Sequence, residues 1–132
     1  VLILRQYDHA LAKAASEFDE ADNLISIACR PQDLQHMESS LEGAIARAVA
    51  VRIAIQDTPN TDIVGEDEER YAGIATEVRR CESVVPFIAL FDGPNAIFAI
   101  KDSFAQEYGV LVRGQFLTSI LHWFYQMQLW EA

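Results

Sequence analysis

Apolar residues recur at alternating spacings of three and four through the first part of the chain, which is the pattern of one buried face on a long helix. Charged and polar residues fill the positions between them. We therefore predict a helix over residues 3–29. Its apolar positions are Leu4, Tyr7, Leu11, Ala14, Phe18, Ala21, Ile25 and Ala28.

A second run with the same spacing follows Pro31, a residue that is tolerated at the first position of a helix because its missing N–H would be unpaired there. The run predicts a helix over residues 31–56. Two long helices joined by a tight turn favour an antiparallel hairpin over residues 3–56. The apolar positions of the second helix are Leu34, Met37, Leu41, Ala44, Ala48, Val51 and Ile55.

Residues 57–65 contain the turn-forming residues of a loop, and four acids, Glu66–Glu69, follow directly. Acidic residues are favoured in the first turn of a helix by the partial positive charge at its N-terminus, so we interpret this run as the start of a third helix and not as a metal site. The three-four spacing extends that helix to Glu82. Pro86 then either kinks the helix or begins a new turn capped by Ser83.

Residues 84–100 allow two interpretations. They read as a β-hairpin with its turn at 92–95, or as two helices separated by a Gly-Pro break. We favour the helices, because one apolar face continues beyond this segment and because an isolated hairpin is only marginally stable. The residues of that face are Ile97, Ile100, Phe104, Tyr108 and Leu111.

The segment from Val112 to Trp130 is apolar on nearly every side. A helix without a polar face is either surrounded within its own domain or completes its burial against something else. Aromatic residues and methionine are enriched at the cores of interfaces, so we expect a partner or a ligand to bind here. The candidate residues are Phe116, Ile120, His122, Trp123, Phe124, Met127 and Trp130.

Together these patterns predict an all-α fold, a four- to five-helix bundle built on the long antiparallel hairpin. The alternative is an α+β fold with a small hairpin near residues 84–100. The chain has 132 residues, of which 51% are hydrophobic, so we expect residues 1–132 to form one helical domain or a fragment of a longer chain.

Charge narrows the range of partners. Ten basic against 20 acidic residues give a formal net charge of −10. Nucleic-acid binding and adhesion to anionic membranes both depend on Lys and Arg, so we expect neither. No apolar run approaches the roughly 18 residues of a membrane span. Arg47 and Arg52 are expected to pair with nearby acids.

Candidate chemistry is sparse. Cys29 and Cys81 form no CxxC motif, and we interpret them as reduced, buried thiols of a cytoplasmic protein. Asp33 and His36 have the spacing of a bundle metal site, but the second pair that such a site needs is absent. His122 is expected to be a neutral, buried imidazole. We predict no catalytic residue, metal or cofactor.

The leading functional hypothesis is therefore a non-enzymatic helical module that binds another protein or a second copy of itself through its C-terminal helix. The alternative is a protein that holds a small apolar or aromatic ligand between its C-terminal helices. A carboxylate and histidine metal site in a helical bundle is the third hypothesis.

Overall fold

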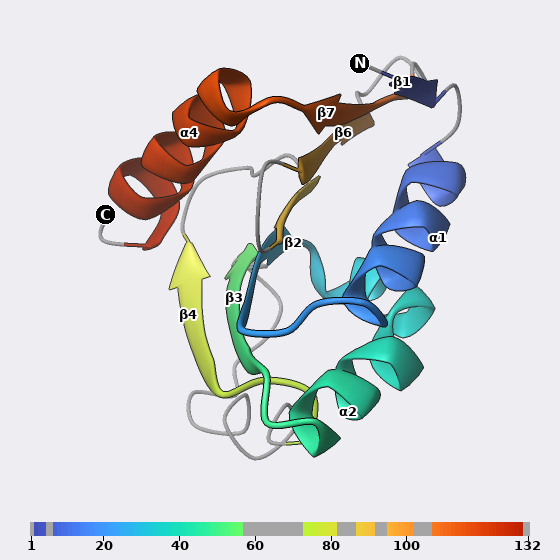
Figure 1. Ribbon diagram of the computed structural model, residues 1–132, viewed down its shortest axis with the longest axis vertical. Coiled ribbons are helices and arrows are strands. Elements are labelled where there is room, and N and C mark those ends of the chain that lie inside the picture. The colour runs from blue at the N-terminus through green and yellow to red at the C-terminus, as the bar shows by residue number, and fades with distance from the viewer. Residues whose placement is uncertain are drawn as a thin grey trace.

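The computed structural model describes residues 2–4, 7–56, 73–81, 87–91, 95–101 and 107–130, and it has an α+β fold. Helices lie on both sides of one sheet (Figure 1). The elements in chain order are β1 (Leu2–Leu4), α1 (Tyr7–Phe18), β2 (Leu24–Cys29), η1 (Pro31–His36), α2 (Glu38–Ala46), β3 (Ala50–Gln56), β4 (Glu77–Cys81), β5 (Phe87–Leu90), β6 (Asn95–Lys101), β7 (Glu107–Arg113), α4 (Gln115–Phe124) and η2 (Tyr125–Trp130).

The sheet has seven strands in the order β1-β7-β6-β5-β2-β3-β4. Strands β2, β3 and β4 are parallel to one another, and α2 lies in the connection between β2 and β3. Parallel neighbours need such a crossover, because a tight turn can only reverse the chain. Strand β5 runs antiparallel to β2, and β5, β6, β7 and β1 form an antiparallel series. The sheet is therefore mixed.

Side chains alternate between the two faces of each strand, and each face has its own apolar cluster. Ile25, Ile27 and Ile53 belong to the cluster that packs against α1 and α2, which we call the α1 face. Ala28 and Ala54 belong to the cluster that includes Tyr125 and Trp130, which we call the α4 face. Figure 1 shows α1 and α2 on one side of the sheet and α4 on the other.

The prediction of an all-α bundle is wrong, because the last part of each long predicted helix is a strand. Residues 24–29 and 50–56 form the paired parallel strands β2 and β3. A strand that is buried on both faces carries apolar residues at nearly every position, so a three-four spacing can be picked out of it without a helix being present. The β-branched residues of these strands, Ile25, Ile27, Val51, Ile53 and Ile55, were the overlooked signal.

The hairpin that was given as the alternative for residues 84–100 is present. Strands β5 and β6 pair antiparallel, with Phe87 opposite Ala99 and Leu90 opposite Ala96. The objection that such a hairpin is marginally stable fails, because β2 and β7 flank it and complete the sheet. The helical face predicted to reach Leu111 is likewise wrong, since residues 107–113 form β7; Phe104 lies outside the described residues.

Other predictions agree with the structure in part. Helix α1 occupies the middle of the first predicted helix and buries the expected residues Tyr7, Leu11, Ala14 and Phe18. Pro31 does begin a new helical segment, η1. The Glu66–Glu69 run, Ser83 and Pro86 lie outside the described residues. Residues 77–81, predicted to continue the third helix, form β4 instead.

A tight turn after α2 holds a non-glycine residue in the left-handed region. Ala48 has φ 63°, the backbone N–H of Val49 donates to the carbonyl of Ala44 at 3.0 Å, and that of Ala48 donates to the carbonyl of Ile45 at 3.0 Å. This pattern is the Schellman motif, in which glycine usually occupies the left-handed position. The turn directs the chain from α2 into β3.

We expect Ala48→Gly to raise the free energy of unfolding by roughly 0.5–1 kcal/mol, because relief of the left-handed strain exceeds the extra entropy that glycine gives the unfolded chain. Urea denaturation followed by circular dichroism measures the change. Ala44→Gly is the control. It removes a methyl group from the buried interior of the same helix and should lower the stability instead. Equal losses for both variants would contradict this account of the turn.

Candidate functional site

The C-terminal segment carries the candidate residues, and most of them lie at the surface. The exposed fractions are 78% for Phe116, 49% for Ile120, 61% for Trp123 and 48% for Met127. Phe116, Ile120 and Trp123 differ by four and seven residues, so they fall on one side of α4, and the exposed Met127 follows them in the π-helical turn η2. We call them the α4 stripe. They face away from the small, buried Thr118, which lies on the sheet side of α4.

The remaining candidates are placed differently. Trp130 is 5% exposed and belongs to the cluster on the α4 face, and Phe124 is half-buried against the same cluster. His122 is exposed and not enclosed as predicted, although partial burial and the nearby charge of Arg52 lower the pKa of its imidazole. The structure therefore separates the candidates into the exposed α4 stripe and the residues that pack against the sheet, Phe124 and Trp130.

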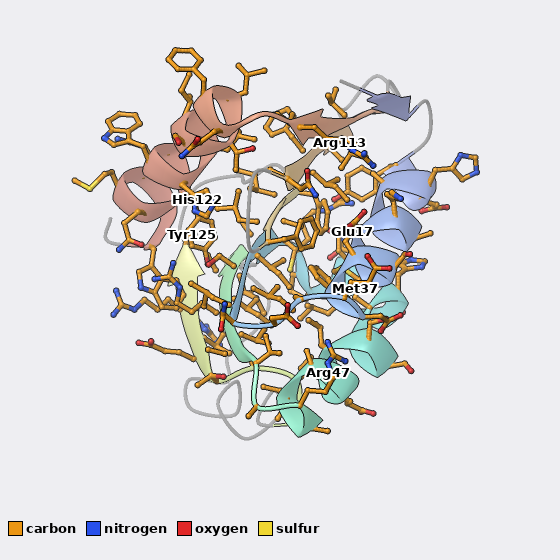
Figure 2. All side chains as sticks on the ribbon, viewed as in Figure 1. Glu17, Met37, Arg47, Arg113, His122 and Tyr125 are labelled. Atoms are coloured by element: carbon orange, nitrogen blue, oxygen red, sulfur yellow. The ribbon has the colours of Figure 1, made fainter. Side chains whose placement is uncertain are left out.

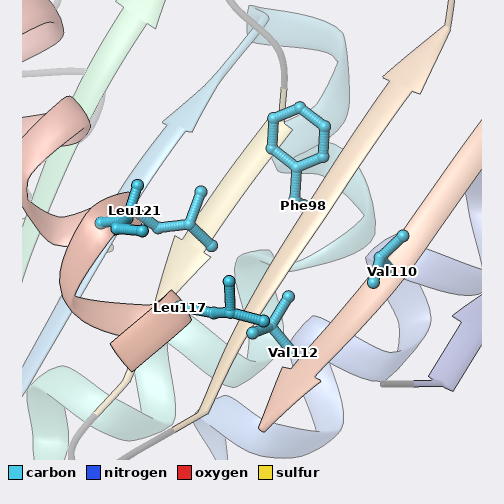
Figure 3. Close-up of a pocket in the computed structure, with 6 residues that line it drawn as sticks. Phe98, Val110, Val112, Leu117 and Leu121 are labelled. Atoms are coloured by element: carbon cyan, nitrogen blue, oxygen red, sulfur yellow. The ribbon is translucent and has the colours of Figure 1, made fainter. Parts of the chain in front are cut away.

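An open apolar groove runs between α4 and the sheet. It encloses about 250 Å³, and Figure 3 shows helix side chains on one side of it and strand side chains on the other. Side chains of β6 and β7 form the floor of the groove. The lining residues are Phe98, Val110, Val112, Leu117, Ile120 and Leu121.

The end of the C-terminal segment is fixed to the sheet by two arginines and two aromatic rings, which we call the arginine–aromatic clip: Arg52, Arg79, Tyr125 and Trp130. The two rings stack with their centroids 6.1 Å apart. The guanidinium of Arg52 lies 5.1 Å from the centre of the Trp130 ring, and that of Arg79 lies 4.5 Å from it. Cations at these distances are attracted to the negative face of the ring.

Hydrogen bonds complete the clip. The Tyr125 hydroxyl lies 3.1 Å from the carbonyl oxygen of Ile27, to which it donates, and burial raises the pKa of this phenol. Arg79 Nη1 donates to the carbonyl oxygen of Trp130 at 3.0 Å. Arg52 Nη1 donates to Gln126 Oε1 at 3.2 Å, and its Nη2 donates to Ser26 Oγ at 3.1 Å. Figure 2 shows Tyr125 on the side of the C-terminal segment that faces the sheet.

These contacts correct the prediction that Arg47 and Arg52 pair with local acids, whereas Arg79 does pair with the nearby Glu77 at 3.4 Å. Arg52 interacts with a hydroxyl, an amide and two rings. Arg47 Nη2 donates to the backbone carbonyls of Phe18 at 2.8 Å and Ala21 at 3.3 Å, so it caps the end of α1. Sequence reasoning missed the clip, although a charged residue at position 52 inside an apolar strand was a usable signal.

A second polar cluster lies where the chain leaves β2. Asp33 is 3% exposed, and its Oδ2 accepts hydrogen bonds from the Tyr7 hydroxyl at 2.8 Å and the Arg30 backbone N–H at 3.1 Å. Arg30 Nη2 donates to Oδ1 at 3.2 Å, and its guanidinium lies 5.2 Å from the centre of the Tyr7 ring. Burial, and then the charge of Asp33, raise the pKa of the Tyr7 phenol.

This cluster replaces the metal interpretation of Asp33 and His36. The carboxylate of Asp33 is bound by an arginine and a phenol, whereas His36 is exposed. Within the described residues, no three His, Cys, Asp or Glu side chains are grouped so that they could hold a metal ion. Cys29 and Cys81 are buried, as predicted, and burial raises the pKa of each thiol.

Sequence comparison with family models gives one match, which extends over residues 1–132. It is described as the transcriptional regulator TrmB, EBD N-terminal subdomain. The chain belongs to this family. No curated protein matches the chain in sequence.

Solved structures share the fold. TrmBL2, described as an archaeal chromatin protein with a novel mode of DNA binding, superposes with a TM-score of 0.77 at 18% identity over 98% of this chain and 51% of its own. This chain therefore spans about half the length of TrmBL2.

Two further solved structures are also similar. Nuc, a phospholipase D family member from Salmonella typhimurium, gives a TM-score of 0.66 at 17% identity, covering 89% of this chain and 84% of its own. NucT from Helicobacter pylori gives 0.70 at 14% identity, covering 98% and 93%. At these identities the likeness establishes the fold and nothing about activity.

Membership of the TrmB family overturns three functional predictions. It replaces the helical interaction or oligomerisation module, the protein for a small apolar ligand and the bundle metal site with a domain related to transcription regulators. The prediction that the protein has no nucleic-acid partner is also wrong. It was based on the net charge of one 132-residue segment, and that charge does not describe the whole of a regulator of this family. No described helix is both long enough and apolar enough to cross a membrane.

We expect Asp33→Asn to lower the free energy of unfolding by about 1–3 kcal/mol, because an amide cannot accept every hydrogen bond that the buried carboxylate accepts. Urea denaturation measures the loss. Glu17→Gln is the matched control, since it breaks the more exposed Lys13–Glu17 ion pair and should cost less than about 1 kcal/mol. Equal effects would mean that the buried cluster is not a stabilising anchor.

For the clip, we expect Arg52→Ala to lower the free energy of unfolding by roughly 1–3 kcal/mol through lost hydrogen bonds and ring contacts. It should also shift the tryptophan emission to longer wavelength, because Trp130 loses its cover. Arg113→Ala, at an exposed position at the end of β7, controls for loss of charge alone. An unchanged emission spectrum in Arg52→Ala would show that Arg52 does not hold the C-terminal segment.

Proposed function

We propose that this chain is the N-terminal half of the effector-binding domain of a DNA-binding transcription regulator of the TrmB type. The observation that carries the proposal is the family match along the whole of residues 1–132, together with a fold that superposes on nearly all of this chain in TrmBL2. In this proposal the regulator as a whole binds DNA, and this segment contributes to the control of that binding by a small molecule.

The engagement of the arginines supports a controlling role for this segment. Arg30 binds Asp33, Arg47 caps α1, and Arg52 and Arg79 hold the C-terminal segment in the clip. Guanidinium groups committed in this way stabilise the fold, and each would have to give up such a contact to bind a phosphate. The net charge of −10 also disfavours direct binding of this segment to phosphates.

The buried cluster of Tyr7, Arg30 and Asp33 lies at a place in the fold where a bound ligand would contact it. It lies directly after a parallel strand, and in α/β sheets ligands are commonly bound outside the carboxyl ends of the strands. Residues 1–132 are proposed to form one domain, because all seven strands share one sheet. A regulator of transcription acts where the DNA is, so we propose a cytoplasmic protein.

The test uses the full-length regulator. Thermal unfolding in the presence of a panel of polyols, carboxylates and phosphorylated metabolites identifies compounds that raise Tm by mass action. Fluorescence anisotropy then measures the affinity for DNA from the regulator's own promoter. We expect at least one stabilising compound to change that affinity by about 5- to 150-fold, the usual range of allosteric coupling.

Arg30→Lys tests the part played by this segment, because lysine keeps the charge but not the fork of donors that holds Asp33. It should weaken the response to the compound while DNA affinity without the compound is retained. Glu17→Gln, at a distant ion pair, should behave like the wild type. A regulator that binds no DNA, or whose DNA affinity is indifferent to every stabilising compound, would overturn the proposed function.

A further inference from the structure

The C-terminal segment is notable for the charges that it lacks. From Gln115 to Trp130 there is no Asp, Glu, Lys or Arg, although charged residues make up 23% of the chain. Among the described side chains of this segment, five large apolar ones are nevertheless exposed, namely the α4 stripe and Leu117, which is 44% exposed. Loss of charged residues combined with aromatic residues and methionine is the composition of the core of an interface.

The groove extends this apolar surface onto the sheet. Leu117 and Ile120 line the groove and are also exposed on α4, so the two surfaces are continuous. On the sheet side the surface continues through Phe98, Val110 and Val112. A continuous patch of this kind, formed by a helix and two strands, is larger than the scattered apolar residues that ordinary surfaces carry.

The helix that carries this exposed apolar surface is fixed to the sheet. Trp130 and Tyr125 are buried, and the clip fixes the end of the segment to β2, β3 and β4 by hydrogen bonds from Tyr125, Arg52 and Arg79. A helix held in this way cannot rotate its exposed residues inward without breaking those contacts. The α4 stripe therefore remains exposed unless another part of a protein covers it.

We propose that the α4 stripe and the groove form the interface with the second subdomain of the same effector-binding domain, within one polypeptide. The inference rests on the proposed function. The matched family describes an N-terminal subdomain, and this chain corresponds to 51% of the TrmBL2 chain. TrmBL2 therefore has further polypeptide about as long as this chain, and a regulator built in the same way has polypeptide outside residues 1–132 from which a second subdomain can cover the patch. The covering surface is expected to be apolar, with aliphatic side chains that enter the groove.

The experiment uses the full-length regulator with p-benzoylphenylalanine in place of Trp123 and, separately, in place of Phe116. Irradiation crosslinks the benzophenone to whatever carbon–hydrogen bonds lie against it. Mixing light and 15N-labelled regulator before irradiation separates crosslinks within one polypeptide from those between two. We expect crosslinks within one polypeptide, to apolar residues that lie outside residues 1–132.

The control carries the same group in place of Ser39, which is exposed on α2 on the opposite side of the sheet. It should give no more than background crosslinking. Thiol labelling of Trp123→Cys provides an independent measurement: its rate in the native regulator should be at least about 10-fold below that of Ser39→Cys, and the difference should vanish in urea.

Crosslinks between light and heavy copies would overturn the proposal in favour of a dimer interface. Crosslinking at the level of the Ser39 control, together with fast labelling at position 123, would overturn it by showing that the patch is open. Neither result depends on DNA binding or on an effector. A failure here is therefore distinguishable from a failure of the proposed function, which is read from DNA affinity.

Discussion

Strands β2 and β3 exclude water from both of their faces, and the other elements are arranged around this double burial. Ile25, Ile27 and Ile53 require cover on the α1 face, which α1 and α2 supply. Ala28 and Ala54 require cover on the α4 face, which the C-terminal segment supplies. The two covers come from opposite ends of the described chain, so the sheet cannot be completed by local folding alone.

The two covers are built differently. On the α1 face, large aliphatic residues of the strands pack against alanine and leucine positions of α1. On the α4 face β2 and β3 contribute the small residues Ala28, Ala54 and Ser26, and these leave room for two large rings, Tyr125 and Trp130. Aliphatic packing is non-directional, whereas an aromatic ring offers a polar group or an electron-rich face that a partner can bind in a defined orientation. Arg52 and Arg79 bind the faces of the rings in this way.

The two faces of the sheet are therefore covered to different extents. Helices α1 and α2 cover the α1 face, whereas the C-terminal segment is fixed to the α4 face but leaves apolar residues exposed. The clip fixes the C-terminal segment at its end, while α4 keeps an apolar stripe and a groove exposed. In the regulator that we propose, such a side would be suited to transmit a change between two subdomains, because a rigid helix moves as a unit with the sheet to which it is attached. The cluster of Tyr7, Arg30 and Asp33 ties α1 to the end of β2 within the same sheet.

The sequence by itself determined the local features: the helical face of α1, the start of η1 at Pro31, the buried thiols, and a C-terminal helix with more apolar surface than it needs. It did not determine whether the apolar runs around Ile27 and Ile53 were helix or strand. That choice depends on which other segments pair with them, and the pairing of β2 with β3 and β5 is visible only in the folded chain.

The same limit applies to the site. The apolar composition of the last helix indicated a surface that the helix alone does not bury, but the roles of Trp123, exposed, and Trp130, buried, could not be told apart from spacing. Nor could Arg52 be assigned to rings contributed by residues more than seventy positions later in the chain. Composition and periodicity record how much surface a segment must bury, whereas long-range packing decides which neighbour buries it.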